Sequence, residues 1–281
     1  MVGAIARDGP TQEEHGIPLR PWMRFVHVHY AVNTAMVLGY AVLRFRVSSP
    51  RLTTKETWTG QSQEMEVIGL AAASLFSKYR KIATFDELLE RLFFTGKTCV
   101  AALLLFFGVP HLVSYLLVWA VVSLVVQYPR FNFPAEVKTL SPGDFQSIVR
   151  SPAAHATGQQ VTWLVMFHAD WCSGSNNIQP MFGALARRHA SKNRRFAHVD
   201  VVAYPEVAED LNINTSGTSK QLPTLALFAD GREVCRLPTF ASDGRVVRAR
   251  LDERGVTKYF ELDREFKAAS YARKSKGRGK S

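Results

Sequence analysis

The chain has 281 residues, of which 47% are hydrophobic, and a formal net charge of +11; its length allows about one or two domains. The positive charge favours anionic partners such as a lipid bilayer, but no aromatic nucleic-acid-binding signature accompanies it, so we expect no nucleic acid partner. The three cysteines have neither CxxC nor paired Cys/His spacing, which argues against a zinc site or a disulfide framework, and we expect no metal and no cofactor.

Residues 1–130 are predicted to form an N-terminal membrane region with three apolar segments, at about 25–43, 67–77 and 98–128. The first segment is uncharged over nineteen residues, which is enough for one transmembrane helix across a hydrocarbon core of about 30 Å. Its histidines and its asparagine leave an amphipathic helix or a cleaved leader open as alternatives. The second segment is too short to span a bilayer, and we interpret it as an interfacial helix.

The third segment is the longest and carries no charged residue over the 32 positions 98–129. One straight helix of that length would overshoot the bilayer at about 1.5 Å per residue. Gly108 and Pro110 lie inside it and are expected to break the helix. We therefore predict a transmembrane helix over about 111–127, preceded by a tilted or re-entrant piece over 98–107. A buried helix pair in a soluble protein is the alternative.

The charge distribution bears on the side of the membrane that the C-terminal domain occupies. The loop before the third segment is basic, whereas the only basic residues among the twenty that follow the segment are Arg130 and Lys138. The positive-inside rule alone would put that loop in the cytosol and the domain across the membrane. A re-entrant hairpin would keep both flanks on one side, and the basic tail at 266–281 favours the cytosol. We expect a cytosolic domain on a single-pass or multi-pass protein, with the lumenal side as the alternative.

Residues 131–265 have the pattern of an α/β domain. Strands are predicted at about 136–140, 161–168 and 196–202, and the second is apolar enough to be a central strand buried on both faces. Helices are predicted to begin at Ser141 and to cover about 173–189, 205–213 and 252–271. A hairpin over 222–237 turns at Asp230-Gly231, and a further turn is expected at Asp243-Gly244. This order predicts a mixed sheet with flanking helices.

Two short motifs lie at the ends of predicted strands, one after the central strand and one at the start of the hairpin. Trp171-Cys172-Ser173-Gly174-Ser175 comes after the central strand, with Pro180 eight residues after the cysteine, and Leu222-Pro223-Thr224 opens the hairpin. Together they resemble the active site of the thioredoxin superfamily. The resemblance implies a thioredoxin-like fold in which a cis peptide bond at Pro223 faces Cys172, so that the two motifs form one site.

Other parts of the sequence narrow the resemblance. The apolar N-terminal segments, the stretch 220–228 and the extension at 243–248 are similar to those of thioredoxin-related transmembrane proteins. The similarity is strong from about residue 160 to 270 and looser before. It implies a protein of the endoplasmic reticulum membrane that carries a thioredoxin-like domain with an atypical motif.

Cys172 is the predicted nucleophile. The helix expected to begin at Ser173 leaves backbone N–H groups unpaired at its start, and these favour a thiolate at the cysteine. Trp171 is expected to cover one side of the sulfur, and the segment 222–224 to offer backbone to an extended substrate. His168 is a candidate for tuning the thiolate, and a core histidine at a strand end is the alternative.

Two departures from the superfamily pattern limit the chemistry. Ser175 occupies the position of the second cysteine, and Met166 occupies that of a buried acid with which relatives move protons. A lone thiol can form a mixed disulfide but cannot expel its substrate, so a second thiol of the client protein, or glutathione, must finish the reaction. If active, the protein is then a disulfide-isomerase-like CxxS enzyme or a client trap. A non-catalytic protein-binding scaffold at the membrane is the alternative.

Three further features are interpreted more simply. Cys235 is read as a small packed residue of the hairpin, and Cys99 as part of the membrane segment, with palmitoylation as an alternative. Asn214-Thr215-Ser216 fits a glycosylation acceptor, which matters only if the domain faces the lumen.

Overall fold

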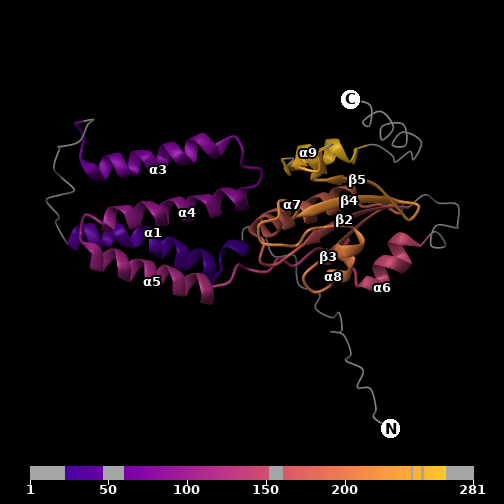
Figure 1. The fold of residues 1–281 in the computed structure, drawn as a ribbon, viewed down its shortest axis with the longest axis horizontal. Helices are drawn as coiled ribbons and strands as arrows, with labels where there is room; N and C mark the ends of the chain where they lie inside the picture. Colours follow the sequence, from indigo (N-terminus) through magenta and orange to yellow (C-terminus); the bar gives the residue numbers. More distant parts are fainter. Residues whose placement is uncertain (1–22, 47–59, 152–160, 242, 248–249, 264–281) are drawn as a thin grey trace, which may run out of the picture.

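The computed structural model of the chain describes residues 23–46, 60–151, 161–241, 243–247 and 250–263. A helical region, residues 23–46 and 60–125, lies at one end of the molecule, and the C-terminal domain lies at the other (Figure 1). Since the basic tail at 266–281 lies outside the described residues, the prediction for it stays a prediction.

The C-terminal domain is built on a five-stranded sheet in the order β1-β3-β2-β4-β5. The strands β1, β3 and β2 are parallel, whereas β4 is antiparallel to β2 and β5 is antiparallel to β4. The predicted mixed sheet is thereby confirmed, and the central strand β2 is buried along its whole length, as its apolar run predicts. The bounds are Val137–Thr139 (β1), Thr162–His168 (β2), Arg194–Asp200 (β3), Thr224–Ala229 (β4) and Arg232–Leu237 (β5).

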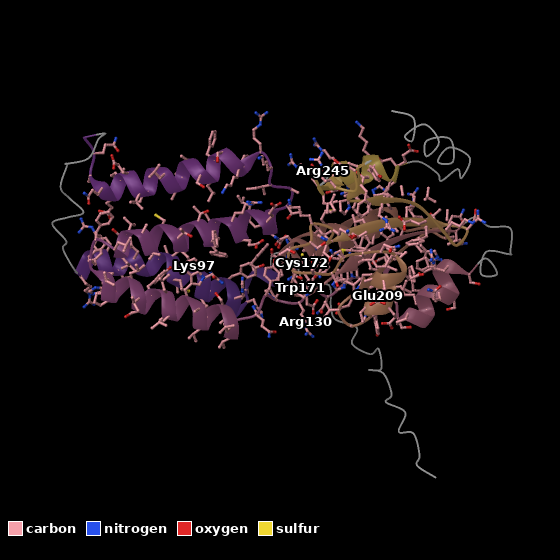
Figure 2. The ribbon with its side chains drawn as sticks, viewed as in Figure 1. Lys97, Arg130, Trp171, Cys172, Glu209 and Arg245 are labelled. Carbon is pink, nitrogen blue, oxygen red and sulfur yellow. The ribbon has the colours of Figure 1, made fainter. Side chains whose placement is uncertain are left out.

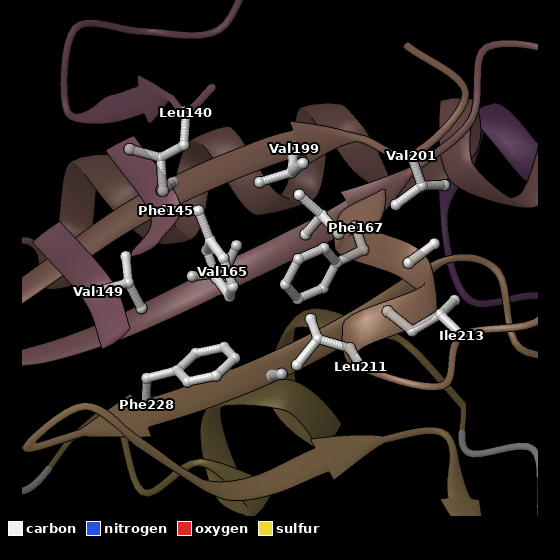
Figure 3. Close-up of a cluster of buried hydrophobic side chains, with 14 of the residues drawn as sticks. Leu140, Phe145, Val149, Val165, Phe167, Val199, Val201, Leu211, Ile213 and Phe228 are labelled. Carbon is white, nitrogen blue, oxygen red and sulfur yellow. The ribbon is translucent and has the colours of Figure 1, made fainter. Parts of the chain in front are cut away.

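Helices cover both faces of this sheet, because β2 alternates its side chains between two hydrophobic clusters. One cluster joins Phe167 and Phe228 of the sheet to Phe145 and to α8 (Figure 3). The other joins Met166 to α7 and α9 on the opposite face. The bounds are Pro142–Asp144 (α6), continued as a π-helical turn over Phe145–Arg150 (η2), Ser173–His189 (α7), Pro205–Asp210 (α8) and Glu253–Tyr259 (α9).

Local signals in the sequence placed most of these elements. Ser141 caps α6 by accepting a hydrogen bond from the N–H of Asp144, whose carboxylate accepts one from the N–H of Ser141. The predicted turn at Asp243-Gly244 joins a small hairpin, β6 (Thr239–Phe240) and β7 (Val246–Val247), and Gly244 has a φ of +77°. The helix predicted over 205–213 is shorter and ends at Asp210.

The closing helix departs furthest from its prediction in this domain. It was expected over 252–271, but α9 ends at Tyr259. Phe260 and Leu262 are both buried in the second cluster, and an α-helix cannot place residues two apart on one face. The chain therefore leaves the helix there, and Glu261 takes a φ of +52°.

Within residues 23–46 and 60–125, the helical region contains four α-helices, which lie together at one end of the molecule (Figure 1). The helix α4 contacts α1, α3 and α5, and the hydroxyl oxygens of Ser62 and Thr84 cap α3 and α4. The bounds are Val28–Arg46 (α1), preceded by a 3-10 turn over Met23–Phe25 (η1), Gln63–Tyr79 (α3), Phe85–Leu104 (α4) and Val109–Val125 (α5).

The prediction for the segment 98–128 was right about its break and wrong about its first half. Gly108 has a φ of +128° and separates α4 from α5, as expected. Residues 98–104 are not a separate piece but the last turns of α4, which begins at Phe85 and carries charged side chains in its first half. Hydropathy could not reveal this because the cap at Thr84, rather than the apolar window, sets where the helix begins.

Among the described residues, no helix combines the length and the apolar character that crossing a membrane requires. The predicted transmembrane helices at 25–43 and about 111–127 therefore stay predictions.

Candidate functional site

Cys172 lies directly after the central strand, where α7 begins. It is the capping residue of α7, and its carbonyl oxygen accepts hydrogen bonds from the N–H groups of Ser175 (2.9 Å) and Asn176 (3.1 Å). Its half-buried sulfur lies 3.8 Å from the carbonyl oxygen of Leu222. The strand–turn–helix geometry thus places a thiol at the positive end of a helix dipole.

The second motif faces this thiol. The peptide bond between Leu222 and Pro223 is cis, as the resemblance implied. A Cβ atom on Gly174 would lie 3.5 Å from Cδ of Pro223 and 3.7 Å from the sulfur of Cys172, so the backbone at Gly174 packs closely against both motifs. Thr224 is buried behind them. The structure therefore brings the two predicted motifs into one site.

The other two residues of the active-site motif are placed differently. Trp171 is 50% exposed, beside the cysteine on the outside of the domain (Figure 2). Ser175 is fully buried, and its hydroxyl oxygen accepts a hydrogen bond from the N–H of Ala169 (3.4 Å). A client cannot reach a hydroxyl in that position, so Ser175 cannot act as a second nucleophile and Cys172 is the one thiol of the motif.

Met166 is fully buried in the second hydrophobic cluster, together with side chains of α7. A thioether carries no titratable proton. Position 166 therefore provides no acid or base beneath the site, as its residue type predicts.

His168 is buried against a second histidine. Its Nε2 lies 3.0 Å from Nδ1 of His198, whose own Nε2 lies 2.9 Å from the hydroxyl oxygen of Thr139. The ring of Phe133 stacks on His198 with centroids 4.1 Å apart. Burial lowers the pKa of His168, and it lowers the pKa of His198 to about 3.

The role of His168 in tuning the thiolate stays a prediction, since its hydrogen bond goes to His198 rather than to Cys172. Sequence reasoning missed His198 as its partner. Met166 of β2 lies beside His198 of the parallel strand β3. His168 is two residues further along β2 and therefore points to the same face of the sheet, so the strand register could have predicted that the two histidines meet.

Sequence reasoning also missed a cavity of about 1360 Å³ that the thiol site shares with the helical region. Trp171, Cys172 and Pro223 line one side, and residues of α3, α4 and the loop between them line the other. The nitrogens Nη1 and Nη2 of Arg250 donate hydrogen bonds to the carbonyl oxygens of Arg80 (3.2 Å) and Ile82 (2.9 Å) in that loop. These contacts hold the helical region over the thiol.

The remaining candidates lie elsewhere. No disulfide joins the three cysteines. Cys235 packs against the second hydrophobic cluster, whereas Cys172 packs against the first, and Cys99 is on α4. Asn214 is exposed on the surface of the domain. Within the part of the chain that the structure describes, no three His, Cys, Asp or Glu side chains are arranged to hold a metal ion.

Known proteins are similar in sequence to the C-terminal domain and to most of the chain. Residues 136–246 match the family model described as Thioredoxin. Thioredoxin-related transmembrane protein 2 of Xenopus tropicalis is 28% identical over 214 residues, which are 75% of this chain and 72% of the relative. Thioredoxin-related transmembrane protein 2-A of Danio rerio is 26% identical over 260 residues, or 90% of this chain and 83% of the relative.

A solved structure of human ERp44 (form I) is similar with a TM-score of 0.34 and 20% identity, over 48% of this chain and 31% of that chain. The family model and the curated relatives confirm the resemblance stated from the sequence motifs. The C-terminal domain is a thioredoxin-like α/β domain, and relatives that align over most of the chain are named as transmembrane proteins.

Proposed function

We propose that this chain, a relative of thioredoxin-related transmembrane protein 2 with a thioredoxin domain at 136–246, is a membrane-anchored protein that carries out thiol–disulfide exchange through one cysteine. The observation that carries the proposal is the position of Cys172. Its sulfur is half-buried at the start of α7 and lies 3.8 Å from the carbonyl of the cis Leu222–Pro223 segment.

The chemistry follows from a lone thiol. The Cys172 thiolate attacks one sulfur of a disulfide, a bond forms between the two sulfurs, and the other substrate sulfur leaves as a thiolate that takes up a proton. Because Ser175 cannot resolve the mixed disulfide, a second thiolate from the client or from glutathione attacks the substrate sulfur and releases Cys172. One disulfide is consumed and one is formed, so the cycle exchanges or isomerises disulfides without net oxidation.

This reaction is tested with the purified full chain and a small neutral disulfide, hydroxyethyl disulfide. Intact-mass measurement should find one mixed disulfide, peptide mapping should place it on Cys172, and dithiothreitol should reverse it. Cys172→Ala should lose this adduct, whereas the matched control Cys235→Ala should keep it. An adduct yield that is equal in Cys172→Ala and wild type would refute the proposed function.

A non-catalytic scaffold is the second candidate, and buried Met166 favours it. Relatives that turn over rapidly carry a proton-moving acid at this position, as the superfamily resemblance implies, and a thioether offers none. If Cys172 forms no adduct while partners of the wild-type protein still bind Cys172→Ala, the scaffold is the better description.

We also propose that the helical region associates with the endoplasmic reticulum membrane and that the thioredoxin domain faces the cytosol. Large apolar side chains such as Leu124 and Phe76 are 80% and 82% exposed, which is typical of surfaces that meet a membrane or another protein. Arg250 contacts the loop that carries Arg80 and Lys81, which supports a position of the basic loop and the domain on the same side of the membrane. The positive-inside rule then favours the cytosol for both.

Asn214 reports on this orientation because it is exposed and fits a glycosylation acceptor. In sealed microsomes the full chain should sediment with the membranes, remain unglycosylated, and lose its C-terminal domain to added protease. A glycan on Asn214 that Asn214→Gln removes would place the domain in the lumen instead.

A further inference from the structure

The cavity at Cys172 has walls from both regions of the molecule. Figure 2 shows Trp171 and Cys172 at the end of the domain that faces the helices, and Lys97 on the facing side. Its volume of about 1360 Å³ exceeds the roughly 300–1,000 Å³ that is common for small-molecule pockets. The cavity can therefore take a short peptide whose sulfur reaches Cys172.

The charge of the cavity wall is strongly positive. Seven basic side chains line it against two acidic ones, Glu87 and Glu90. Glu87 already pairs with Arg91 (2.7 Å), and Glu90 accepts a hydrogen bond from Asn177. The basic residues are Lys78, Arg80, Lys81, Arg91, Lys97, Lys220 and Arg250.

In the ranges that the structure describes, five of these cations have no Asp or Glu oxygen within 4.0 Å of their side-chain nitrogens: Lys78, Arg80, Lys81, Lys97 and Lys220. Lys97 instead donates a hydrogen bond to Oδ1 of Asn33. Unpaired charges of one sign around a concave surface concentrate ligands of the opposite sign. The wall therefore favours an anionic substrate.

Asn177 favours a ligand that donates a hydrogen bond. It is 4% exposed and also lines the cavity. Its Nδ2 donates a hydrogen bond to the carboxylate of Glu90, which can only accept, so the orientation of the amide is determined. Its Oδ1 is buried without a hydrogen-bond partner. A ligand with an N–H group would supply the missing donor.

We propose that the disulfide substrate of Cys172 is a short anionic peptide disulfide of the glutathione type. Such a molecule carries carboxylates for the unpaired cations, peptide N–H groups for Asn177, and a disulfide for the thiol. This inference rests on the exchange reaction proposed above and names its substrate class.

The reaction with this substrate balances without a further oxidant or reductant. The Cys172 thiolate attacks one sulfur of the peptide disulfide, a mixed disulfide forms, and one peptide leaves as a thiolate that takes up a proton. A thiolate of a client protein then attacks the peptide sulfur, takes the peptide as a mixed disulfide, and releases Cys172. The net result is transfer of a peptidyl thiol group to the client.

Three disulfides of different charge test the proposal: glutathione disulfide (anionic), hydroxyethyl disulfide (neutral) and cystamine (cationic). A Cys99→Ala/Cys235→Ala chain keeps Cys172 as its one thiol, and adduct formation is followed by intact mass. Each rate is divided by the rate of the urea-unfolded chain with the same disulfide, which cancels intrinsic reactivity. The anionic disulfide should exceed the cationic one by about tenfold or more at low salt, and high salt should reduce the difference.

Two charge variants assign the preference to the cavity. Lys81→Gln/Lys220→Gln should lower the rate with glutathione disulfide several-fold and leave the neutral rate unchanged. The matched control Arg187→Gln/Lys192→Gln removes two exposed charges at the other end of α7 and should behave as wild type.

The outcomes separate the two proposals. No adduct with any of the three disulfides would refute the exchange function itself. Equal normalised rates, or cystamine as the fastest, would overturn the substrate class and leave the function standing. A preference for the anion that persists in Lys81→Gln/Lys220→Gln would overturn the assignment to this cavity.

Discussion

The two regions of the molecule differ in where they keep their large apolar side chains. In the C-terminal domain, six phenylalanines, Phe167 and Phe228 among them, are less than 2% exposed. In the helical region, α3 and α5 have no buried residue at all. The domain thus contains its own hydrophobic core, whereas the helices expose an apolar surface of the kind that is typical of contacts with a membrane or another protein.

Polar contacts join the two regions. Arg250 donates to two loop carbonyls, and Asn177 donates to Glu90 on α4. Polar contacts of this kind fix orientation while contributing modest net stability. The comparison therefore predicts that the domain is stable by itself and that the stability of the helices depends on their surroundings. It also predicts that a single substitution can loosen the interface between the two regions.

The largest expected effect comes from comparing a buried side chain with an exposed one. Phe228→Ala should lower the free energy of unfolding of the domain by about 3–5 kcal/mol, because it opens a cavity in the core. Leu124→Ala on α5, where the side chain is 80% exposed, should change it by less than about 0.5 kcal/mol. Chemical denaturation of the full chain in detergent micelles, followed by fluorescence, measures both. Equal effects would contradict the contrast between the two regions.

A smaller effect is expected at the interface. Arg250→Ala removes two charge-assisted hydrogen bonds to the loop between α3 and α4, each contributing roughly 1.5–3 kcal/mol where the donor is charged. Amide hydrogen exchange over residues 80–84 should therefore become at least about tenfold faster, while exchange in β2 stays unchanged.

Arg245→Ala is the matched control for this prediction. Arg245 is paired with Asp243 inside its own turn and is strongly exposed, so its removal should leave the loop at 80–84 as protected as in wild type. If Arg250→Ala also leaves that loop protected, the helical region is held by other contacts.

The third expected effect is a pH dependence confined to the domain. Burial lowers the pKa of His168 and His198 below the ordinary 6.5, that of His198 to about 3, so the unfolded chain binds their protons first as the pH falls. Their contribution to stability is complete above about pH 6.5 and is lost progressively towards pH 3. The slope is at most about 1.4 kcal/mol per pH unit for each histidine.

Denaturation at several pH values between 5 and 7 should show a shallower slope for His198→Gln than for wild type. His189→Gln removes a histidine outside the pair, in the last turn of α7, and should keep the wild-type slope. An unchanged slope in His198→Gln would show that the pair does not control the acid stability of the domain.

Much of the fold and of the site was accessible from the sequence. The capping box at Ser141, the break at Gly108 and the apolar run of β2 each depend on a few neighbouring residues, so local patterns revealed them. The two motifs around Cys172 and Pro223 predicted their juxtaposition through resemblance, and the structure places them together.

What the sequence by itself determined is the lone thiol at Cys172 and the serine at position 175 in place of a second cysteine, and the resemblance to the thioredoxin superfamily implied the cis proline that faces the thiol. Only the tertiary structure decided that α9 stops at Tyr259 and that basic side chains of the helical region line the same cavity as the thiol. The physical reason is the distance along the chain over which each signal acts: a helix cap or a periodic pattern depends on neighbouring residues. The contact of Arg250 with residues 80 and 82 joins elements about 170 residues apart, and it exists only once separate surfaces have packed.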